Sequence, residues 1–368
     1  MSTFVVLTHT DWTEAPRLRH QVAQLLLEHG HTVYWFERAG GPLGRKASEP
    51  AAAARAGTPA KAAPHVVATR RLVHHQLRVV PPLHWANARF LVPQLKRFVR
   101  DKNIGPDAII INFNFDYYFL RQVFPQNRII TIINDDFEGM SKLPFRSHLT
   151  WALKRTCQMS DSVLAVSTSL VARLRLWSDA KLFVPWAVTP YQEPHGDISQ
   201  RTKLLFWGFV NRRLDVDMLE RVSEHLRTAH PTFSILIVGP VEGADGRAIQ
   251  ARLESRGNVE FRGRSNLSDL PMDQVLAAII PYRRHPETDA IYQTNKTMQL
   301  LSHGLPLLIS GMPDFVQLPF VVRLDSPEGI GAAIGLCVQQ FGKWQSHIRD
   351  YIQQNSPESR LHDLGATP

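Results

Sequence analysis

The sequence predicts an α/β protein of two domains, each built around a parallel sheet. Its 368 residues are more than a single-domain protein usually has, because single hydrophobic cores stop growing near ~250 residues. Short apolar strands alternate with amphipathic helices almost throughout, which is typical of parallel sheets with helical crossovers. Residues 184–197 interrupt this alternation with three prolines and a glycine, after which it restarts.

These observations set the expected domain limits. The first domain is predicted at 1–185 and the second at 198–340, with a linker at 186–197. Residues 341–368 are predicted to form a C-terminal helix, around Trp344 to Gln354, and a tail that could cross back to the first domain.

Runs dense in Ile and Val define the strands of the first domain, and their composition is that of strands buried on both faces. We expect them at 4–9, 31–38, 107–113, 128–134 and 162–167. Residues 17–31 are predicted to form the first helix, which stops at Gly30. Residues 39–64 are rich in Ala, Gly and Pro without an apolar period, so they are expected to form a mobile surface loop.

The second domain repeats the pattern. Strands are predicted at 203–209, 233–240, 258–263, 277–282 and 306–310. Helices are predicted at 214–230 and 295–304. In such sheets ligands bind beyond the carboxyl ends of the strands, so two domains that face each other across a cleft could hold two substrates.

The net charge of +9 is concentrated in one segment. Residues 38–102 hold thirteen Lys and Arg against only Glu49 and Asp101. A segment of this kind indicates an anionic partner, which could be nucleic acid, an acidic membrane surface or a phosphorylated substrate, or else a solvated loop. No apolar run is long enough to span a membrane, and the N-terminus lacks a signal-peptide pattern, so we expect only peripheral membrane contact.

The strongest chemical motif covers residues 281–310. A strand end, a polar loop, a lysine at a helix start and a Gly-x-Pro turn follow one another. A helix N-terminus offers free N–H groups and a positive dipole to a phosphate, and Lys296 would add a full charge. Taken alone, Asn295 could be only a helix cap and Lys296 a solvated residue.

This block resembles the donor-binding block of the GT-B glycosyltransferases. The resemblance extends over nearly the whole chain, through residues 16–37, 130–140, 184–191 and 204–222. It implies a GT-B fold of two Rossmann-like domains facing each other across a cleft. It also implies that the first domain binds the acceptor and the second a nucleotide-diphosphate sugar, with a UDP-sugar favoured.

The block departs from retaining members of the family, which usually carry two glutamates eight residues apart. Ile291 and Gln299 stand at the corresponding positions. The block is similar to that of xanthan-type glucuronosyltransferases. This resemblance implies an inverting, metal-independent reaction on a polyprenyl-diphosphate oligosaccharide. A retaining reaction, with Gln299 in place of the missing acid, stays open.

Inversion requires a carboxylate that deprotonates the acceptor hydroxyl. Asp135 and Asp136 directly follow the predicted strand at 128–134, and the resemblance favours Asp135 as the base. One of the two could simply cap the following turn. Asp11, after the first strand, and Arg17 are assigned to acceptor binding.

Other residues are assigned to the donor. Arg212 and Arg213 follow a strand where GT-B enzymes place cations on the diphosphate, and only one of them need bind it. Asp215 and Asp217 resemble a metal-binding acidic triplet but open an apolar-periodic helix, where acids are ordinary, so no metal is expected.

Residues in or near the lysine block complete the donor set. Glu287 and Asp289 could bind sugar hydroxyls, or they could be surface acids that balance the arginines at 283 and 284. Tyr282 and Tyr292 could contact the base or sugar, or they could pack against their neighbours. Asn295, Lys296 and Gln299 are the remaining donor candidates.

Residues 65–102 are predicted to contact an anionic membrane surface. The segment interleaves arginines with apolar side chains, namely Trp85, Phe90, Leu91, Leu95 and Phe98. Its prolines, Pro81, Pro82 and Pro93, are expected to break it into short helical pieces. A core-packing helix with a basic solvated face is the alternative.

The sequence thus predicts a hexosyl- or glucuronosyltransferase for surface polysaccharide, acting on a lipid-linked oligosaccharide or another glycan acceptor. We expect it to be cytoplasmic and peripherally bound to the inner face of the plasma membrane, without a cofactor or nucleic acid. Cys157 and Cys337 fit packed thiols in a reducing compartment. A nucleic-acid binder and a silent scaffold of the same fold are the competing hypotheses.

Overall fold

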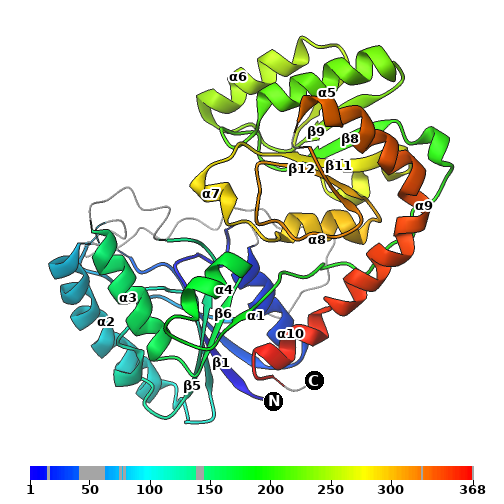
Figure 1. Cartoon of the computed structure of the whole chain (residues 1–368). Helices are drawn as coiled ribbons and strands as arrows, with labels where there is room; N and C mark the ends of the chain where they lie inside the picture. Colours follow the sequence, from blue (N-terminus) through cyan, green and yellow to red (C-terminus); the bar gives the residue numbers. More distant parts are fainter. Residues whose placement is uncertain are drawn as a thin grey trace. The chain divides into compact units, whose positions relative to one another are not determined.

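A computed structural model describes residues 1–14, 17–40, 63–73, 77, 80–137, 145–324 and 326–366. The chain divides into two compact units. The first comprises Met1–Phe183 and Pro357–Pro368, and the second comprises Val184–Ser356. Each unit contains a parallel sheet with helices on its faces (Figure 1). Of the predicted loop at 39–64, residues 41–62 lie outside the described residues.

The first unit contains a seven-stranded sheet in the order β3-β2-β1-β4-β5-β6-β7. Its strands are β1 (Thr3–Leu7), β2 (Thr32–Phe36), β3 (His65–Val67), β4 (Ile109–Asn112), β5 (Arg128–Ile133), β6 (Ser162–Ala165) and β7 (Ala180–Leu182). All neighbouring pairs are parallel. The central strands are buried along almost their whole length, as their Ile- and Val-rich sequences predict.

Helices α1 (Leu18–Glu28) and α10 (Pro357–Asp363) contact each other in this unit. Helix α2 (Pro81–Asp101) packs on strands β1, β2 and β4, whereas α3 (Arg146–Gln158) and α4 (Thr168–Leu174) share a core with β5 and β6. Helix α1 ends as predicted before Gly30, whose φ of 76° suits glycine.

The prolines do not break α2, which corrects the prediction of short pieces. Pro81 and Pro82 occupy the first turn, where a missing N–H removes no intrahelical hydrogen bond. Pro93 lies inside the helix and costs one hydrogen bond. Burial of Leu91 and Leu95 in the core offsets this cost. The helix is therefore continuous over 21 residues.

The second unit contains a six-stranded parallel sheet in the order β10-β9-β8-β11-β12-β13. Its strands are β8 (Lys203–Trp207), β9 (Ser234–Val238), β10 (Val259–Arg262), β11 (Val275–Pro281), β12 (Leu307–Ser310) and β13 (Val321–Arg323). Helices α5 (Val216–Ala229) and α6 (Gly243–Glu254) lie on one face, and α8 (Asn295–Ser302) lies on the other (Figure 1). From β8 the chain moves towards one edge of the sheet, and from β11 it moves towards the other. Because the crossovers between parallel strands are right-handed, the helices of the two halves lie on opposite faces.

The segment predicted as a linker packs against the second unit. The buried Arg201 side chain donates to His195 O at 2.6 Å and to Val275 O at 2.7 Å. Pro194 packs so closely that a Cβ on Gly304 would lie 2.3 Å from its Cγ. These contacts hold residues 186–197 to the unit that begins at Val184.

Helix α9 (Ile330–Gln354) is longer than predicted. Its apolar residues recur at helical spacing from Ile330 to Ile352, so the predicted limit between 340 and 341 falls inside one continuous helix. After it, Leu361 and Leu364 are fully buried, and this last segment groups with the first unit.

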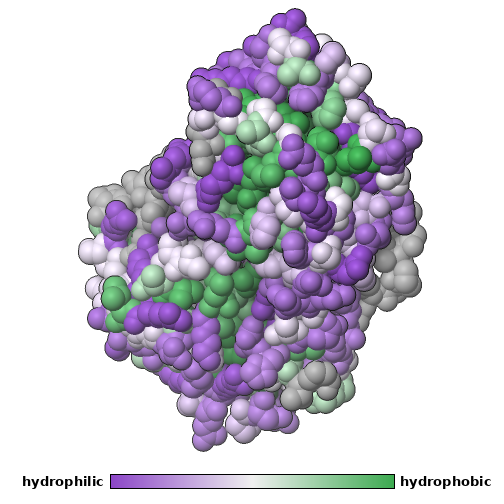
Figure 2. Space-filling view, turned by 45° about the vertical axis from the view of Figure 1, so that its right-hand side comes forward, coloured by the Kyte–Doolittle hydropathy of each residue, from purple (hydrophilic) through white to green (hydrophobic). Residues whose placement is uncertain are grey.

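Polar residues cover most of the face drawn in Figure 2, with apolar residues reaching the surface in limited areas. Within the described parts of the chain, every helix is too short or too polar to cross a membrane. Cys157 and Cys337 are free and buried, and burial raises the pKa of each thiol to about 12. Both are packed side chains rather than reactive thiolates.

Candidate donor and acceptor sites

The strand orders locate one candidate crevice in each unit. In the second sheet the chain moves outward from β8 in one direction and from β11 in the other, so the order reverses between these two strands. In the first sheet it reverses between β1 and β4. Ligands of doubly wound sheets bind beyond the carboxyl ends of the strands at such a reversal.

Glycines allow the loops at the carboxyl edge of the second sheet to pack closely. A Cβ on Gly239 would lie 2.0 Å from Gly208 O, and Gly239 has a φ of 146°. A Cβ on Gly311, with a φ of 68°, would lie 1.8 Å from Tyr282 O. Both positions exclude any side chain, so the loops at this edge pack backbone against backbone.

Helix α8 begins at this edge, and side-chain hydrogen bonds cap its N-terminus. The Thr294 side chain accepts a hydrogen bond from Thr297 N–H at 3.2 Å, and the Thr297 hydroxyl accepts one from Thr294 N–H at 3.1 Å. The cap is therefore Thr294, and Asn295 is the first helical residue rather than the cap considered from sequence. The reciprocal bonds fix the direction of the helix N-terminus.

Lys296 lies in the first turn of α8 at the end of β8. Its Nζ donates to Tyr282 Oη at 2.8 Å and lies 4.8 Å from the ring centre of Phe206. A Cβ on Gly208 would come within 3.2 Å of the ammonium. Among the described residues, no carboxylate forms an ion pair with Lys296. Its charge is held by aromatic rings and a phenol, which leaves it able to bind an anion.

The loop after β8 carries Arg212 and Arg213, whose side chains are exposed. Arg213 O accepts a hydrogen bond from Arg283 N–H at 2.9 Å, and Leu214 forms an antiparallel bridge with Tyr282. The loops after β8 and β11 therefore meet where the strand order reverses. The structure brings both arginines to the same edge of the sheet as Lys296.

The acids after this loop have structural roles. Asp215 caps α5 by accepting from Met218 N–H at 3.0 Å, and Asp217 pairs with Arg252 at 2.7 Å. These contacts agree with the prediction that the two acids belong to an ordinary helix start.

The other donor candidates surround α8. Tyr292 and Gln299 are half-buried, and burial raises the pKa of Tyr292. Asp289 pairs with Arg284 at 3.5 Å, as the alternative reading of this loop proposed. The Glu287 side chain lies outside the described residues.

Asp135 and Asp136 follow β5 at the carboxyl edge of the first sheet. Asp136 forms an ion pair with Arg173 of α4 at 2.8 Å. Asn134 donates from its side-chain amide to the Asp135 carboxylate. The ion pair with Arg173 holds Asp136 in place, whereas a neutral side-chain amide contacts Asp135.

Asp11 and Arg17 flank the turn after β1. Asp11 N–H donates to Glu14 Oε1 at 3.3 Å, and Glu14 also pairs with Arg38 at 2.5 Å. Arg17 lies 3.6 Å from Glu14, with its side chain 60% exposed. Asp11 thus lies at the reversal point of this sheet, and Arg17 extends towards solvent at the start of α1.

A buried acid that was not predicted from the sequence lies at the same point. Asp116 follows β4, is 3% exposed and lies 3.8 Å from His84 Nε2. His84 Nδ1 in turn lies 2.9 Å from His148 Nε2. Asp116 comes shortly after a buried strand, as Asp11 and Asp135 do. The same position in the sequence could therefore have predicted it.

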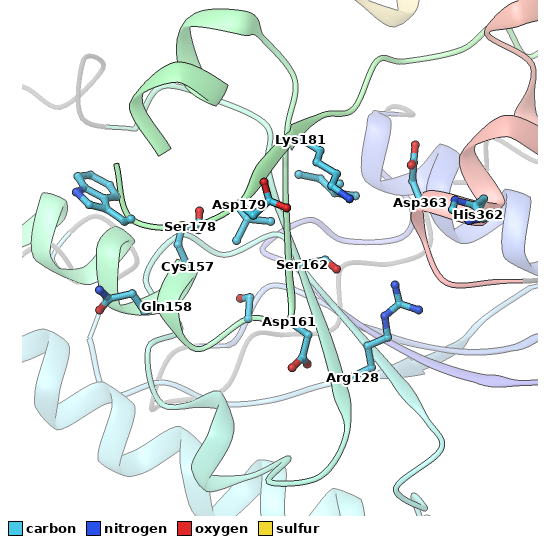
Figure 3. Close-up of a pocket in the computed structure, with 14 residues that line it drawn as sticks. Arg128, Cys157, Gln158, Asp161, Ser162, Ser178, Asp179, Lys181, His362 and Asp363 are labelled. Carbon is cyan, nitrogen blue, oxygen red and sulfur yellow. The ribbon is translucent and has the colours of Figure 1, made fainter. Parts of the chain in front are cut away.

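A pocket of about 380 Å³ lies at the opposite edge of the first sheet (Figure 3). Arg128, Ser162 and Lys181 line it from the amino ends of β5, β6 and β7, and His362 and Asp363 line it from α10. Burial alone would raise the pKa of Asp161, another lining residue, but the Ile129 N–H and the Arg121 guanidinium lower it below its ordinary value. No predicted site residue lines this pocket.

Comparisons with known proteins give similarity in structure only. No protein-family model and no curated protein match the sequence. The chain resembles the lipopolysaccharide outer core galactosyltransferase WaaB, at 12% identity and a TM-score of 0.64, over 98% of both chains. It also resembles WaaG, a glycosyltransferase involved in lipopolysaccharide biosynthesis, at 12% identity and 0.61, over 99% of this chain and 100% of that one.

A third similar structure is an E. coli protein described as trehalose-6-phosphate bound with UDP-2-fluoro glucose. The identity is 12% and the TM-score 0.61, over the whole of both chains. Together with the two parallel sheets, these similarities show that the fold is GT-B, with two Rossmann-like units. At such identities they do not transfer an activity.

Proposed function

We propose that the protein is a glycosyltransferase that takes a sugar from a nucleotide-diphosphate donor, with a UDP-sugar favoured. In this proposal the second unit holds the donor at the carboxyl ends of β8 and β11. The first unit holds a lipid-linked oligosaccharide or another glycan acceptor. One structural neighbour is described as bound with UDP-2-fluoro glucose, which supports this class of donor.

The observation that carries the proposal is Lys296 at the capped N-terminus of α8. The first turn of a helix has N–H groups without intrahelical partners and a positive dipole, and both favour a phosphate. Lys296 adds a charge held by Tyr282 and Phe206. Arg212 and Arg213 add two more cations from the adjoining loop. This group of positive charges suits a diphosphate.

The proposed reaction inverts the anomeric centre. Asp135 accepts the proton of the acceptor hydroxyl as its oxygen forms a bond to the anomeric carbon. The bond between that carbon and the diphosphate oxygen breaks, and Lys296 and the arginines stabilise the released negative charge. Asp135 is preferred to Asp136 because Arg173 already pairs with Asp136. If the NMR spectrum of the product shows a retained anomeric configuration, the inverting step is wrong and a retaining reaction takes its place.

The proposal includes a cytoplasmic location, peripheral contact with the inner face of the plasma membrane and a role in surface polysaccharide synthesis. The basic segment at 65–102 supports membrane contact through charge. Transfer of either a hexose or a glucuronic acid is compatible with the residues assigned.

The test is calorimetric titration of UDP- and GDP-sugars into the protein, repeated with Lys296→Ala. We expect one donor to bind selectively and its dissociation constant to rise at least about tenfold in the variant, because a charge-assisted hydrogen bond is lost. Lys343→Ala, at an exposed position on α9, is the matched control and should bind as the wild type does.

The proposal fails if none of the nucleotide sugars binds the wild-type protein, or if Lys296→Ala binds the donor unchanged. Binding without turnover of any acceptor mixture would instead favour the silent scaffold. Tight, salt-dependent binding of RNA without affinity for nucleotide sugars would favour the nucleic-acid hypothesis.

A further inference from the structure

The outer face of α2 is strongly cationic. Its exposed side chains include Arg89, Lys96, Arg97 and Arg100. The single acid of the helix, Asp101, is its last residue and pairs with Arg100 at 3.0 Å. The apolar residues expected to meet a membrane, Leu91, Leu95 and Phe98, are instead in the core. Charge rather than an apolar stripe therefore characterises this face.

The outer face of α3 has the same character, although it lies far away in sequence. Arg146, Lys154 and Arg155 are exposed, and the helix contains no acid. Leu149 and Leu153 pack into the core of the first unit. The cations of α3 are thus not needed for its own packing.

The two helices lie side by side (Figure 1). Their side chains meet where His84 contacts His148. The His148 ring of α3 stacks on Trp151 at 5.4 Å between centroids and meets the Trp85 ring of α2 at 6.0 Å. Trp85 is 49% exposed and Trp151 is 39% exposed. Two large indole side chains therefore reach solvent at the junction of two cationic faces.

We propose that the outer faces of α2 and α3 form one surface that docks on an anionic lipid bilayer. Seven basic residues supply attraction to anionic headgroups, and Trp85 and Trp151 enter the interfacial layer, which indole rings favour. The inference rests on the proposed function for its purpose and deepens it by naming the surface and its partner.

The shape of the surface favours a bilayer over a nucleic acid. Proteins that bind single strands usually combine a basic groove with stacking platforms inside it. Here the cations lie on the exposed sides of two neighbouring helices, with exposed indole rings at their contact. An exposed tryptophan beside such cations is typical of a membrane-surface element.

The surface is connected to the loop at the reversal point of the first sheet. His84, next to Trp85, has its Nε2 3.1 Å from the backbone oxygen of Asp116 and its Nδ1 2.9 Å from His148. Docking would therefore bring the candidate acceptor edge of this unit close to the lipid surface. A lipid-linked acceptor could then be reached from the bilayer.

The test is co-sedimentation of the full chain with vesicles of phosphatidylcholine alone or mixed equally with phosphatidylglycerol. The wild type should bind only the mixed vesicles, and high salt should release it. Arg89→Glu with Lys154→Glu should lower partitioning at least about tenfold, because each basic residue near an anionic surface contributes a several-fold effect. Trp85→Ala should weaken binding with less dependence on salt.

The matched control is Arg247→Glu with Lys343→Glu, which makes the same charge change at exposed positions of the second unit. An equal loss in this control, or equal binding of the wild type to both vesicles, would overturn the proposal. So would retention on RNA with none on vesicles. Titration of UDP into the same variants tests donor binding separately, so that a failure of the proposed function would be seen independently.

Discussion

At the scale of single residues, Gly239 decides whether two loops of the second unit can meet. A side chain there would overlap Gly208 O, and the φ of 146° is strained for other residues. We expect Gly239→Ala to lower the free energy of unfolding by at least about 2 kcal/mol. Urea denaturation of the variant measures this change.

Gly335 provides the matched control for that substitution. It lies within α9, and a Cβ there would meet no atom within 4 Å. Gly335→Ala should raise the free energy of unfolding by about 0.5–1 kcal/mol, because alanine loses less backbone entropy in a helix. A small effect of Gly239→Ala, similar in size to this one, would show that the two loops do not need their close contact.

The sequence gives the candidate site residues by type and place in the chain but does not give their partners. Lys296 and Asp135 were predicted from their positions at a helix start and after a strand. The contact of Lys296 with Tyr282 and the pairing of Asp136 with Arg173 join residues 14 and 37 positions apart. Only packing of the helices on the sheet brings such pairs together.

At the scale of elements, the cap of α8 orients the proposed phosphate cradle. Thr294→Ala removes a bond to Thr297 N–H and should cost about 1 kcal/mol of stability. We also expect weaker UDP binding in calorimetry, because the N–H groups of the first turn lose their fixed direction. Calorimetry of UDP binding and measurement of unfolding thus separate the role of the α8 N-terminus in phosphate binding from its contribution to stability.

Ser167 supplies the comparison, because it caps α4 in the first unit by accepting from Leu170 N–H at 3.2 Å. Ser167→Ala should cost a similar free energy of unfolding and leave UDP affinity unchanged. If both variants bind UDP equally well, the α8 terminus is not the phosphate site.

The elements also show why sequence patterns fail at particular points. Strands β3, β7 and β13 were not predicted, and each has only three residues at the margin of a sheet. A run of that length has no measurable period. In α2, by contrast, three prolines predict a broken helix, but burial of one helix face keeps the helix continuous. This burial depends on the rest of the fold, so a local pattern does not reveal it.

At the scale of the whole molecule, buried and half-buried histidines should make stability depend on pH. Burial lowers the pKa of His20, His31, His148 and His303 below the ordinary value of 6.5. His84 lowers that of His148 further, whereas Asp116 raises it. Below pH 6.5 the unfolded chain therefore binds more protons than the native chain does.

The sign follows directly, since stability rises with pH wherever the unfolded state binds more protons. We expect the urea midpoint to fall as the pH is lowered from about 7 to about 5. His20→Gln, at a residue 7% exposed, should reduce this fall. A midpoint that is constant or higher at the lower pH would contradict the expectation.

The sequence by itself determined the two-domain α/β architecture, the parallel strands and the candidate cations and acids. Hydrophobic period, turn residues and strand ends are local properties, so they can be read from short stretches of sequence. Only the tertiary structure decided the continuity of α2, the Thr294 cap and the partners of Lys296 and Asp136. It also placed α3 beside α2 and the C-terminal segment with the first unit. These features depend on contacts between distant residues, whose energies appear only after the sheets and helices have packed.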